Sequence, residues 1–402
     1  MRGMNWILVL IAVVFAVLLL QPTLLERPFW RATITPLASI IGSGFLIIAP
    51  LLGAIAGEQA LGAMLLILLL AYSVGGIIRF NIRHAEPPLA VGGRPALAAT
   101  ERFSNVMLSI AYVVSIAFYL RLLASFVLDH FELASPYPAQ WLTTAILLFI
   151  GIYGWRRGLK SLEHLEAYSV GIKLAIIGAL LVGLLAHDLN SGFTSAVSGV
   201  EGYSALDQLR MLGGMLLVVQ GFETSRYLGS EYTTGMRVWS MRAAQILSTC
   251  IYLGFVYLIM PVLPAMHGTL PDETEIIHIA GVVALVLPPM LVIAAVMSQF
   301  SASIADTLAA GGLAEEESRG RFPASRAYLL VAALAIAIIW ATNVFEIVTL
   351  ASRAFAAYYF AQAVVAVQTV PAGMHGAIWL KLWFSILAGL LLAIVLFSIP
   401  VG

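Results

Sequence analysis

Ile40-Ile41-Gly42-Ser43-Gly44-Phe45 is the stretch that decides the fold, because it interrupts an apolar run from about residue 34 to residue 55. Glycine and serine are poor helix formers, and here they fall in the middle of an expected membrane-spanning helix. Lipid cannot satisfy loose backbone groups, so a broken helix is tolerated only where it faces protein or a water-filled cavity. Its free N–H and C=O groups are suited to binding a small charged ligand or ion. Close packing of a neighbouring helix against Gly42 and Gly44 is the alternative interpretation.

The composition of the whole chain indicates an all-α polytopic membrane protein. Of its 402 residues, 61% are hydrophobic and 10% are charged, and the mean hydropathy is +0.97. A soluble domain has about 25% charged residues. The apolar runs are continuous rather than alternating, which excludes an outer-membrane barrel. The net charge is zero, with 21 basic and 21 acidic residues, so nothing in the charge balance points to nucleic acid.

Twelve segments are apolar enough to be predicted as transmembrane helices, each of which needs about 20 apolar residues. They lie near residues 5–22, 31–54, 60–81, 103–128, 139–156, 164–186, 208–230, 240–262, 281–309, 325–342, 344–369 and 376–399. The first segment lacks a small-residue cleavage pattern, so we interpret it as a retained helix rather than a signal peptide.

Lysine and arginine gather in alternate loops, at 79–102, 156–163, 237–242 and 319–326, whereas the intervening loops are acidic. By the positive-inside rule, the basic loops are expected to face the cytoplasm. We therefore expect a protein of the cytoplasmic (inner) membrane of a prokaryote, in contact with membrane lipid. No loop is long enough for a soluble domain and no phosphate-binding loop occurs, which disfavours an ATP-driven pump.

A second interruption falls at the matching place one repeat later. The segment 208–230 is apolar until it meets Gln220, Gly221 and Glu223 near its middle. Transporters are often built from inverted repeats whose broken helices occupy matching positions. The sequence therefore predicts two five-helix repeats, 31–186 and 187–370. An additional N-terminal helix lies within 1–30 and one C-terminal helix within 371–402.

Three patches resemble the amino acid–polyamine–organocation (APC) superfamily of transporters. Ile41-Gly42-Ser43-Gly44-Phe45 resembles its first core helix, and Gln220-Gly221-Phe222-Glu223 resembles its sixth. The segment around Lys173 is similar to its fifth core helix. The resemblance covers the topology of about residues 31–370 and implies the leucine-transporter fold, a five-plus-five inverted repeat.

The chain also departs from this family. The usual proline after the sixth helix is replaced by Thr233-Thr234-Gly235, and the usual aromatic gate before the sixth-helix glycine is replaced by Leu217-Val218-Val219. These departures leave the type of substrate open.

The resemblance implies that both broken helices form the substrate site. The expected binding residues of the first are Ile41, Gly42, Ser43 and Gly44, and those of the second are Val219, Gln220, Gly221 and Phe222. Tyr112, Ser115 and Tyr119 are spaced at i, i+3 and i+7 and share one face of the third core helix. That face either lines the site or packs in the core.

Four polar residues within spans are candidates for ion coupling. In proton-coupled members of the family a lysine at the position of Lys173 replaces a sodium ion and touches the first helix; a lysine snorkelling to the interface is the alternative. Glu223 is expected to bind a substrate ammonium or a proton, or else to cap a helix or pair with Arg226. Ser301 and Ser303 lie where sodium-coupled relatives place hydroxyls, although serines also bond back to their own helix.

The sequence therefore predicts a secondary transporter for a small amino acid, amine or related organic molecule, coupled to protons or to exchange of a second solute. The alternatives are a sodium-coupled carrier and a membrane receptor or complex subunit that senses a small ligand without moving it. Neither an enzyme, a metal site nor a cofactor is expected, because the single Cys250 and the scattered histidines form no reactive or ligating constellation. A homo-oligomer is compatible with the sequence.

Overall fold

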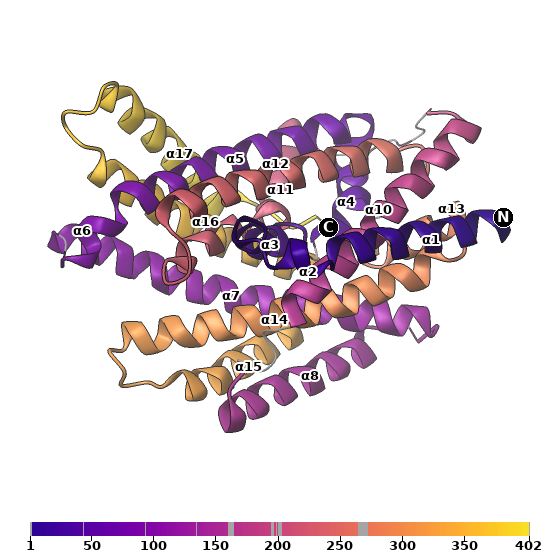
Figure 1. Cartoon of the computed structure of the whole chain (residues 1–402), viewed down its shortest axis with the longest axis horizontal. Helices are drawn as coiled ribbons and strands as arrows, with labels where there is room; N and C mark the ends of the chain where they lie inside the picture. Colours follow the sequence, from indigo (N-terminus) through magenta and orange to yellow (C-terminus); the bar gives the residue numbers. More distant parts are fainter. Residues whose placement is uncertain are drawn as a thin grey trace.

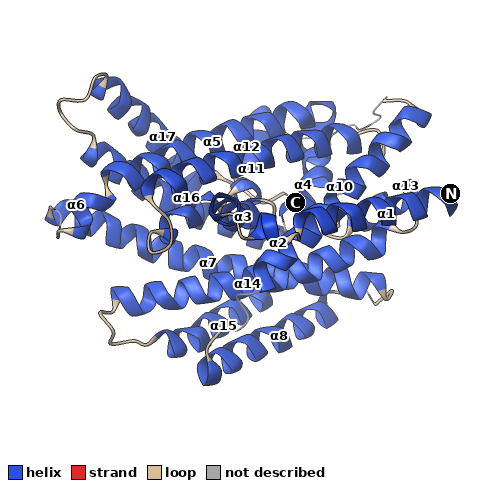
Figure 2. Ribbon diagram, in the orientation of Figure 1, coloured by secondary structure: helices blue, strands red, loops and turns tan. Residues whose placement is uncertain are grey.

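The computed structural model describes residues 2–42, 44–92, 94–133, 135–159, 165–193, 197, 199, 203–263 and 272–401. Over these residues the chain is helical and contains no strand (Figures 1 and 2). The helices of the first half are α1 (Arg2–Leu19), α2 (Pro22–Leu25), α3 (Pro28–Ile40), α4 (Gly44–Ala56), η1 (Gly57–Gln59), α5 (Ala60–His84), α6 (Glu86–Ala90), α7 (Pro95–His130), α8 (Pro136–Arg157) and α10 (Leu165–Ser191). Those of the second half are α11 (Ala205–Gly213), η2 (Leu216–Val219), η3 (Phe222–Leu228), α12 (Thr234–Ile259), α13 (Glu275–Val283), α14 (Leu287–Glu317), α15 (Ala324–Ala341), α16 (Val344–Thr369) and α17 (Ala377–Phe397).

Local sequence explains where several helices begin. Proline occupies the first turn of α2, α3, α7 and α8, where its missing N–H costs no hydrogen bond. A capping box starts α16, because Asn343 accepts from the backbone N–H of Glu346 and the Glu346 carboxylate accepts from that of Asn343. This box separates α15 from α16 by only two residues.

Eight stretches of the described helices are long and apolar enough to cross a membrane, judged by length and composition. The longest, Gly44–His84, includes both α4 and α5, and α1 contributes a shorter apolar helix, Met4–Leu19. The chain is thus an all-helical, polytopic membrane protein. The number of twelve spans and the inverted repeat stay predictions.

The core of the molecule is built around α7. The long helix α14 and the helix α16 both pack along it, and Figure 1 shows α5, α7, α12 and α14 running lengthwise across the molecule. Phe118 and Phe126 of α7 and Phe355 of α16 are completely buried at these contacts. The helices that flank the two broken segments are therefore held by a continuous apolar core.

The N-terminal helix α1 packs on α10 through glycines. A Cβ atom at Gly171 would lie 2.5 Å from the Leu20 side chain, and one at Gly178 would lie 3.0 Å from the ring of Phe15. Small residues allow this close approach of helices within a bilayer. The predicted additional helix is therefore attached to α10, which carries Lys173.

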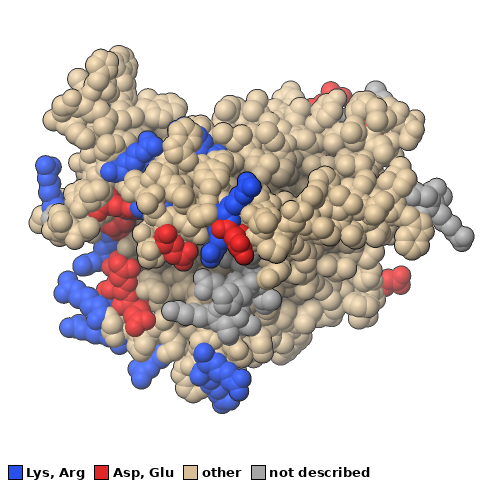
Figure 3. All heavy atoms as spheres, viewed as in Figure 1, with Lys and Arg blue, Asp and Glu red and all other residues tan. Residues whose placement is uncertain are grey.

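Basic side chains gather at one end of the molecule. On the face drawn in Figure 3 the lysines and arginines cluster on the left, the end at which α6 and the loop after α14 lie in Figure 1. We call this end the basic face. The helix ends and loops there agree with the alternation of basic loops read from the sequence.

Candidate functional site

The first predicted interruption is present. Helix α3 ends at Ile40 and α4 begins at Gly44, and Ile41 has φ −88° and ψ 58°, outside the helical region. The sequence places Gly42, Ser43 and Gly44 at this point, and residues of low helix propensity favour a break. Ser43 itself lies outside the described residues.

The second predicted interruption is present as well. The helix α11 ends at Gly213, and the short 3₁₀ helices η2 and η3 follow it with Gln220 and Gly221 between them. Gln220 is extended, and Gly221 has φ +116°, a left-handed conformation that glycine adopts without steric cost. The span expected at 208–230 is thus not a continuous α-helix, because two 3₁₀ helices follow α11 and the chain is interrupted between them at Gln220 and Gly221.

The two interruptions are in direct contact. A Cβ atom at Gly221 would lie 2.3 Å from Cβ of Ser39, and one at Gly44 would lie 2.5 Å from Cα of Val218. Only glycine at both positions allows the two backbones to approach so closely, because any other residue would overlap the facing segment. This geometry brings together residues that are about 180 positions apart in the sequence.

Tyr252 of α12 joins the two broken segments. Its hydroxyl lies 2.9 Å from the carbonyl oxygen of Ile40 and 2.7 Å from that of Val218. Both carbonyls lost their helical partners when the helices ended, and the tyrosine side chain is completely buried. One side chain therefore lies within hydrogen-bond distance of a backbone acceptor from each break.

Glu223 caps the second break. Its Oε2 atom accepts a hydrogen bond from the backbone N–H of Gly221 at 2.9 Å and one from the Tyr359 hydroxyl at 2.6 Å. The alternative partner Arg226 instead forms an ion pair with Glu101 at 3.0 Å. The Glu223 carboxylate thus accepts the hydrogen bond of the Gly221 N–H, which a ligand would otherwise be able to accept at this helix end.

Lys173 of α10 lies against the first broken helix. Its ammonium donates to the carbonyl oxygen of Ala38 at 2.9 Å and to Oγ of Ser298, on α14, at 3.1 Å. The residue is only 5% exposed. It therefore connects α3 to α14 inside the bundle rather than snorkelling to the surface.

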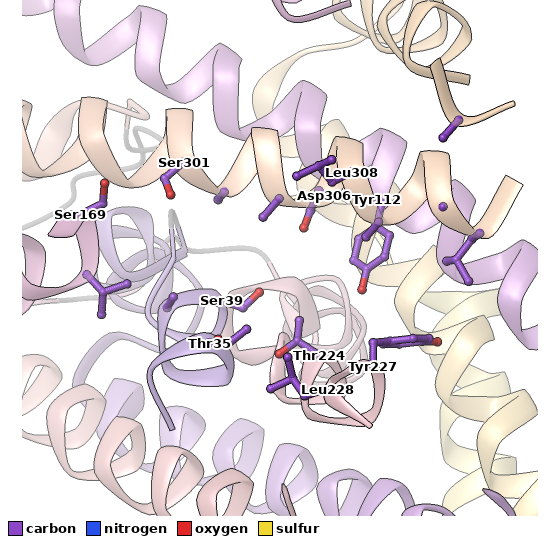
Figure 4. Close-up of a pocket in the computed structure, with 18 of the residues that line it drawn as sticks. Thr35, Ser39, Tyr112, Ser169, Thr224, Tyr227, Leu228, Ser301, Asp306 and Leu308 are labelled. Atoms are coloured by element: carbon purple, nitrogen blue, oxygen red, sulfur yellow. The ribbon is translucent and has the colours of Figure 1, made fainter. Parts of the chain in front are cut away.

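A cavity of about 610 Å³ lies next to these groups, with walls from α3, α7, α10, η3 and α14 (Figure 4). It extends along α14 from Ser298 to Glu316, and Tyr328 of α15 also lines it. Because Glu316 is at the end of α14 that leads into the basic loop, the cavity extends toward the basic face. Its size suits a small organic molecule.

The structure separates the predicted site residues into two groups. Tyr112, Lys173 and Ser301 line the cavity. The described residues that are packed in the bundle and are not part of this lining are Ile41, Gly42, Gly44, Ser115, Val219, Gln220, Gly221, Phe222, Glu223 and Ser303. Ser303 donates back to the carbonyls of Gln299 and Phe300 on its own helix, which is the structural alternative weighed for this serine.

Several lining residues were not predicted. Asp306 of α14 is 6% exposed and faces the cavity together with Ser39, Thr224 and Tyr227 (Figure 4). A carboxylate inside the span predicted at 281–309 was a signal in the sequence, because charged residues within spans are rare and usually functional. Ser39 and Thr224 gave no such signal, since their position depends on how the two broken segments pack.

Comparison with known proteins is informative for nearly the whole chain. Residues 22–398 match the model of a family described as APC superfamily transporter. An uncharacterized protein of Aquifex aeolicus (strain VF5) is 46% identical over 359 residues, which cover 88% of this chain and 87% of that protein. The matched range begins after α1.

Proposed function

Because this chain belongs to the APC superfamily of transporters, we propose that it is a secondary active transporter that carries a small amino acid, amine or related organic solute by alternating access. The observation that best supports this proposal is the contact between two interrupted helical segments beside a cavity of about 610 Å³. Broken helices that face each other near a ligand cavity are the structural basis of transport in proteins built from repeats.

The direction in which the cavity extends supports one state of the transport cycle. It runs from Lys173 and Ser39 toward Glu315 and Glu316 at the basic face. The positive-inside rule assigns that face to the cytoplasm. We therefore assign the structure to an inward-facing state of a protein in the cytoplasmic membrane.

Proton coupling is supported by the position of Lys173. Its ammonium is held by one acceptor on α3 and one on α14, so loss of the proton would remove a charge-assisted connection between these two helices. Protonation would then bias the arrangement of the helices around the cavity, which is what coupling requires. Exchange of one solute for another is the alternative that does not need this titration.

A sodium-coupled carrier has less support from the geometry. Ser303, one of its two expected hydroxyl ligands, donates to its own helix. The Lys173 ammonium already donates a hydrogen bond to Oγ of Ser298 beside the cavity. An ammonium and a sodium ion at one position would repel each other. Sodium dependence of ligand binding would revive this alternative.

The test of the proposed function is uptake into liposomes that contain the purified protein, with and without an imposed pH gradient. We expect accumulation of solute in the wild type and loss of the pH-driven part in Lys173→Ala. Lys381→Ala, an exposed lysine on α17, is the matched control and should retain it. Saturable binding without any flux would instead favour a receptor or complex subunit of this fold.

A further inference from the structure

We propose that the segment 272–283, which contains α13, is an outer lid of the molecule that contacts with α7 hold shut at acidic pH and that loosens as the pH rises through neutrality. This inference rests on the transport function proposed above and concerns the regulation of its site. It is carried by the position of α13, by the contacts that fasten the start of this segment and by a second cavity beside them.

Helix α13 lies at the end of the molecule opposite to the basic face, which we call the outer end (Figure 1). It packs against α4, the second half of the first broken helix, and against α10 and α14, and its residues Ile276 and Ile279 are buried. Among the residues that the structure describes, none of α4 or α13 lines the cavity of about 610 Å³, which extends toward the basic face. Opening that cavity to the outer side therefore requires α4 and α13 to move away from their neighbours.

Three contacts fasten the start of this segment to α7, and we call them the latch. Oγ of Ser125 donates to Oε1 of Glu273 at 3.0 Å, and the hydroxyl of Thr274 donates to Oδ1 of Asp129 at 3.3 Å. Nε2 of His278 lies 3.4 Å from the same oxygen of Asp129. Because α13 cannot move away from α7 without losing these contacts, the latch keeps the outer lid in place.

A small cavity of about 140 Å³ lies at the latch. Its walls come from α7, from the first residues of α8 and from residues 272–274. Arg121 lines it and is 7% exposed, and its guanidinium donates to the carbonyl oxygen of Pro136 at 2.9 Å. A polar cavity of this size has room for water. Water can therefore reach the Glu273 carboxyl and replace its contact with Ser125 without a movement of the long helices.

The charge of Glu273 sets the direction of the pH response. Burial and the neighbouring Asp272 raise the pKa of its carboxyl from 4.5 to about 7. Opening the lid would expose this carboxyl to water and relieve both effects, so the closed lid binds the proton more tightly than the open one. The closed state is therefore favoured fully below pH 4.5, and this advantage is lost as the pH rises through 7. Arg121 attracts the ionised carboxyl and opposes release, but its guanidinium is also engaged by Pro136.

The other titratable groups near the outer lid leave this direction unchanged. His278 pairs with Asp129 only while its imidazole is protonated, so this contact also weakens as the pH rises; the side chain is 65% exposed, and its contribution is small. Glu275 lies in the first turn of α13, where the helix dipole favours its negative charge. At the end of α10, His187 pairs with Asp188 at 3.2 Å. Neither α4 nor the outer half of α14 contains a charged residue.

Cysteine reporters on α13 test this inference on the purified full-length protein in detergent, in a Cys250→Ser background. Ile279→Cys places a thiol on the buried side of the helix, and Val282→Cys places one where the native side chain is 69% exposed. We expect the rate of thiol modification at position 279, divided by the rate at position 282, to rise at least tenfold between pH 5 and pH 7.5 and then to level off. The ratio removes the effect of pH on the thiol itself. A ratio that does not change with pH contradicts the inference.

Variants of the two acidic residues identify the group that titrates. Glu273→Gln is uncharged at every pH, so the ratio should stay near its pH 5 value up to pH 8. Asp272→Asn removes the neighbouring charge, so the rise should move to lower pH. Glu58→Gln, an exposed carboxylate in η1, is the control and should follow the wild type. A Glu273 variant with the wild-type pH profile overturns the assignment.

Hydrogen exchange provides a measurement that needs no reporter cysteine. If the reporter variants fold poorly, the amides of α13 in the protein with its native cysteine should exchange faster than those of Glu273→Gln at pH 7.5 and at the same rate at pH 5, because a comparison at equal pH cancels the chemical exchange rate. Equal exchange at both pH values contradicts the inference.

The outcome also separates this inference from the proposed function. A pH-dependent lid in a protein that gives no flux in liposomes would contradict transport and leave the latch in place. Solute flux combined with a pH-independent ratio would contradict the latch and leave transport in place.

Discussion

At the scale of single residues, Tyr252 connects the two broken helices. We expect Tyr252→Phe to leave the carbonyls of Ile40 and Val218 without their side-chain donor and to cost about 1–3 kcal/mol of stability. Thermal unfolding of the purified protein measures this loss. Tyr257→Phe removes a hydroxyl from a tyrosine on the same helix that is 51% exposed, and it should change the unfolding temperature little. An equal effect of the two variants would show that the Tyr252 hydroxyl has no special role.

Glu273, outside the spans, makes stability depend on pH. Burial and the neighbouring Asp272 raise the pKa of its carboxyl from 4.5 to about 7, and its Oε1 atom accepts from Ser125. The folded protein therefore binds this proton more tightly than the unfolded chain. The stabilisation is complete below pH 4.5 and is lost as the pH rises through 7.

We expect Glu273→Gln to reduce the fall in unfolding temperature between pH 5 and pH 8, because an amide does not titrate. Glu58→Gln, at an exposed site, serves as the control and should follow the wild type. Parallel curves for the Glu273 variant and the wild type would mean that other groups cause the pH dependence.

At the scale of elements, η3 is held to the long helix α7 by a buried ion pair. Arg226 is 3.0 Å from Glu101 and almost fully buried, whereas the adjacent Arg102 pairs with Glu317 at the surface. Removing one member of a buried pair leaves an uncompensated charge and costs about 3–5 kcal/mol. A surface pair contributes about 0–1 kcal/mol.

Neighbouring substitutions on α7 therefore make a matched comparison. We expect Glu101→Gln to lower the thermal unfolding temperature clearly and Arg102→Gln to change it little. A reversed order would mean that η3 is held by its packing and not by its charge.

The elements also show how far the sequence determines this structure. The spans 325–342 and 344–369, predicted from their apolar runs, correspond closely to α15 and α16, and the capping box of Asn343 and Glu346 is the physical reason why α16 begins where it does. Both interruptions were predicted, since glycine and polar residues stand out within apolar runs. The contacts of Tyr252 could not be predicted, because they join residues up to 212 positions apart. Asp306 had a signal, the charge within a span, but its place in the cavity follows only from the packing of α14.

At the scale of the whole molecule, the cavity should be reachable from the basic face. The chain has one cysteine, Cys250, so Cys250→Ser provides a background without thiols. In this background we expect Ser301→Cys to react with a small membrane-impermeant thiol reagent in inside-out vesicles, because Ser301 lines the cavity. Ser303→Cys, two residues away and completely buried, is the matched control and should stay unmodified. Labelling of Ser301→Cys only in right-side-out vesicles would reverse the orientation assigned here.

The Tyr252 contacts also have a consequence for any movement of the two broken segments relative to each other. A phenol has a single hydrogen, so at any instant the Tyr252 hydroxyl donates either to the carbonyl of Ile40 or to that of Val218. If the two segments separate, the hydrogen stays with one of them while water reaches the other. Separating the two segments would therefore break no more than one hydrogen bond to Tyr252.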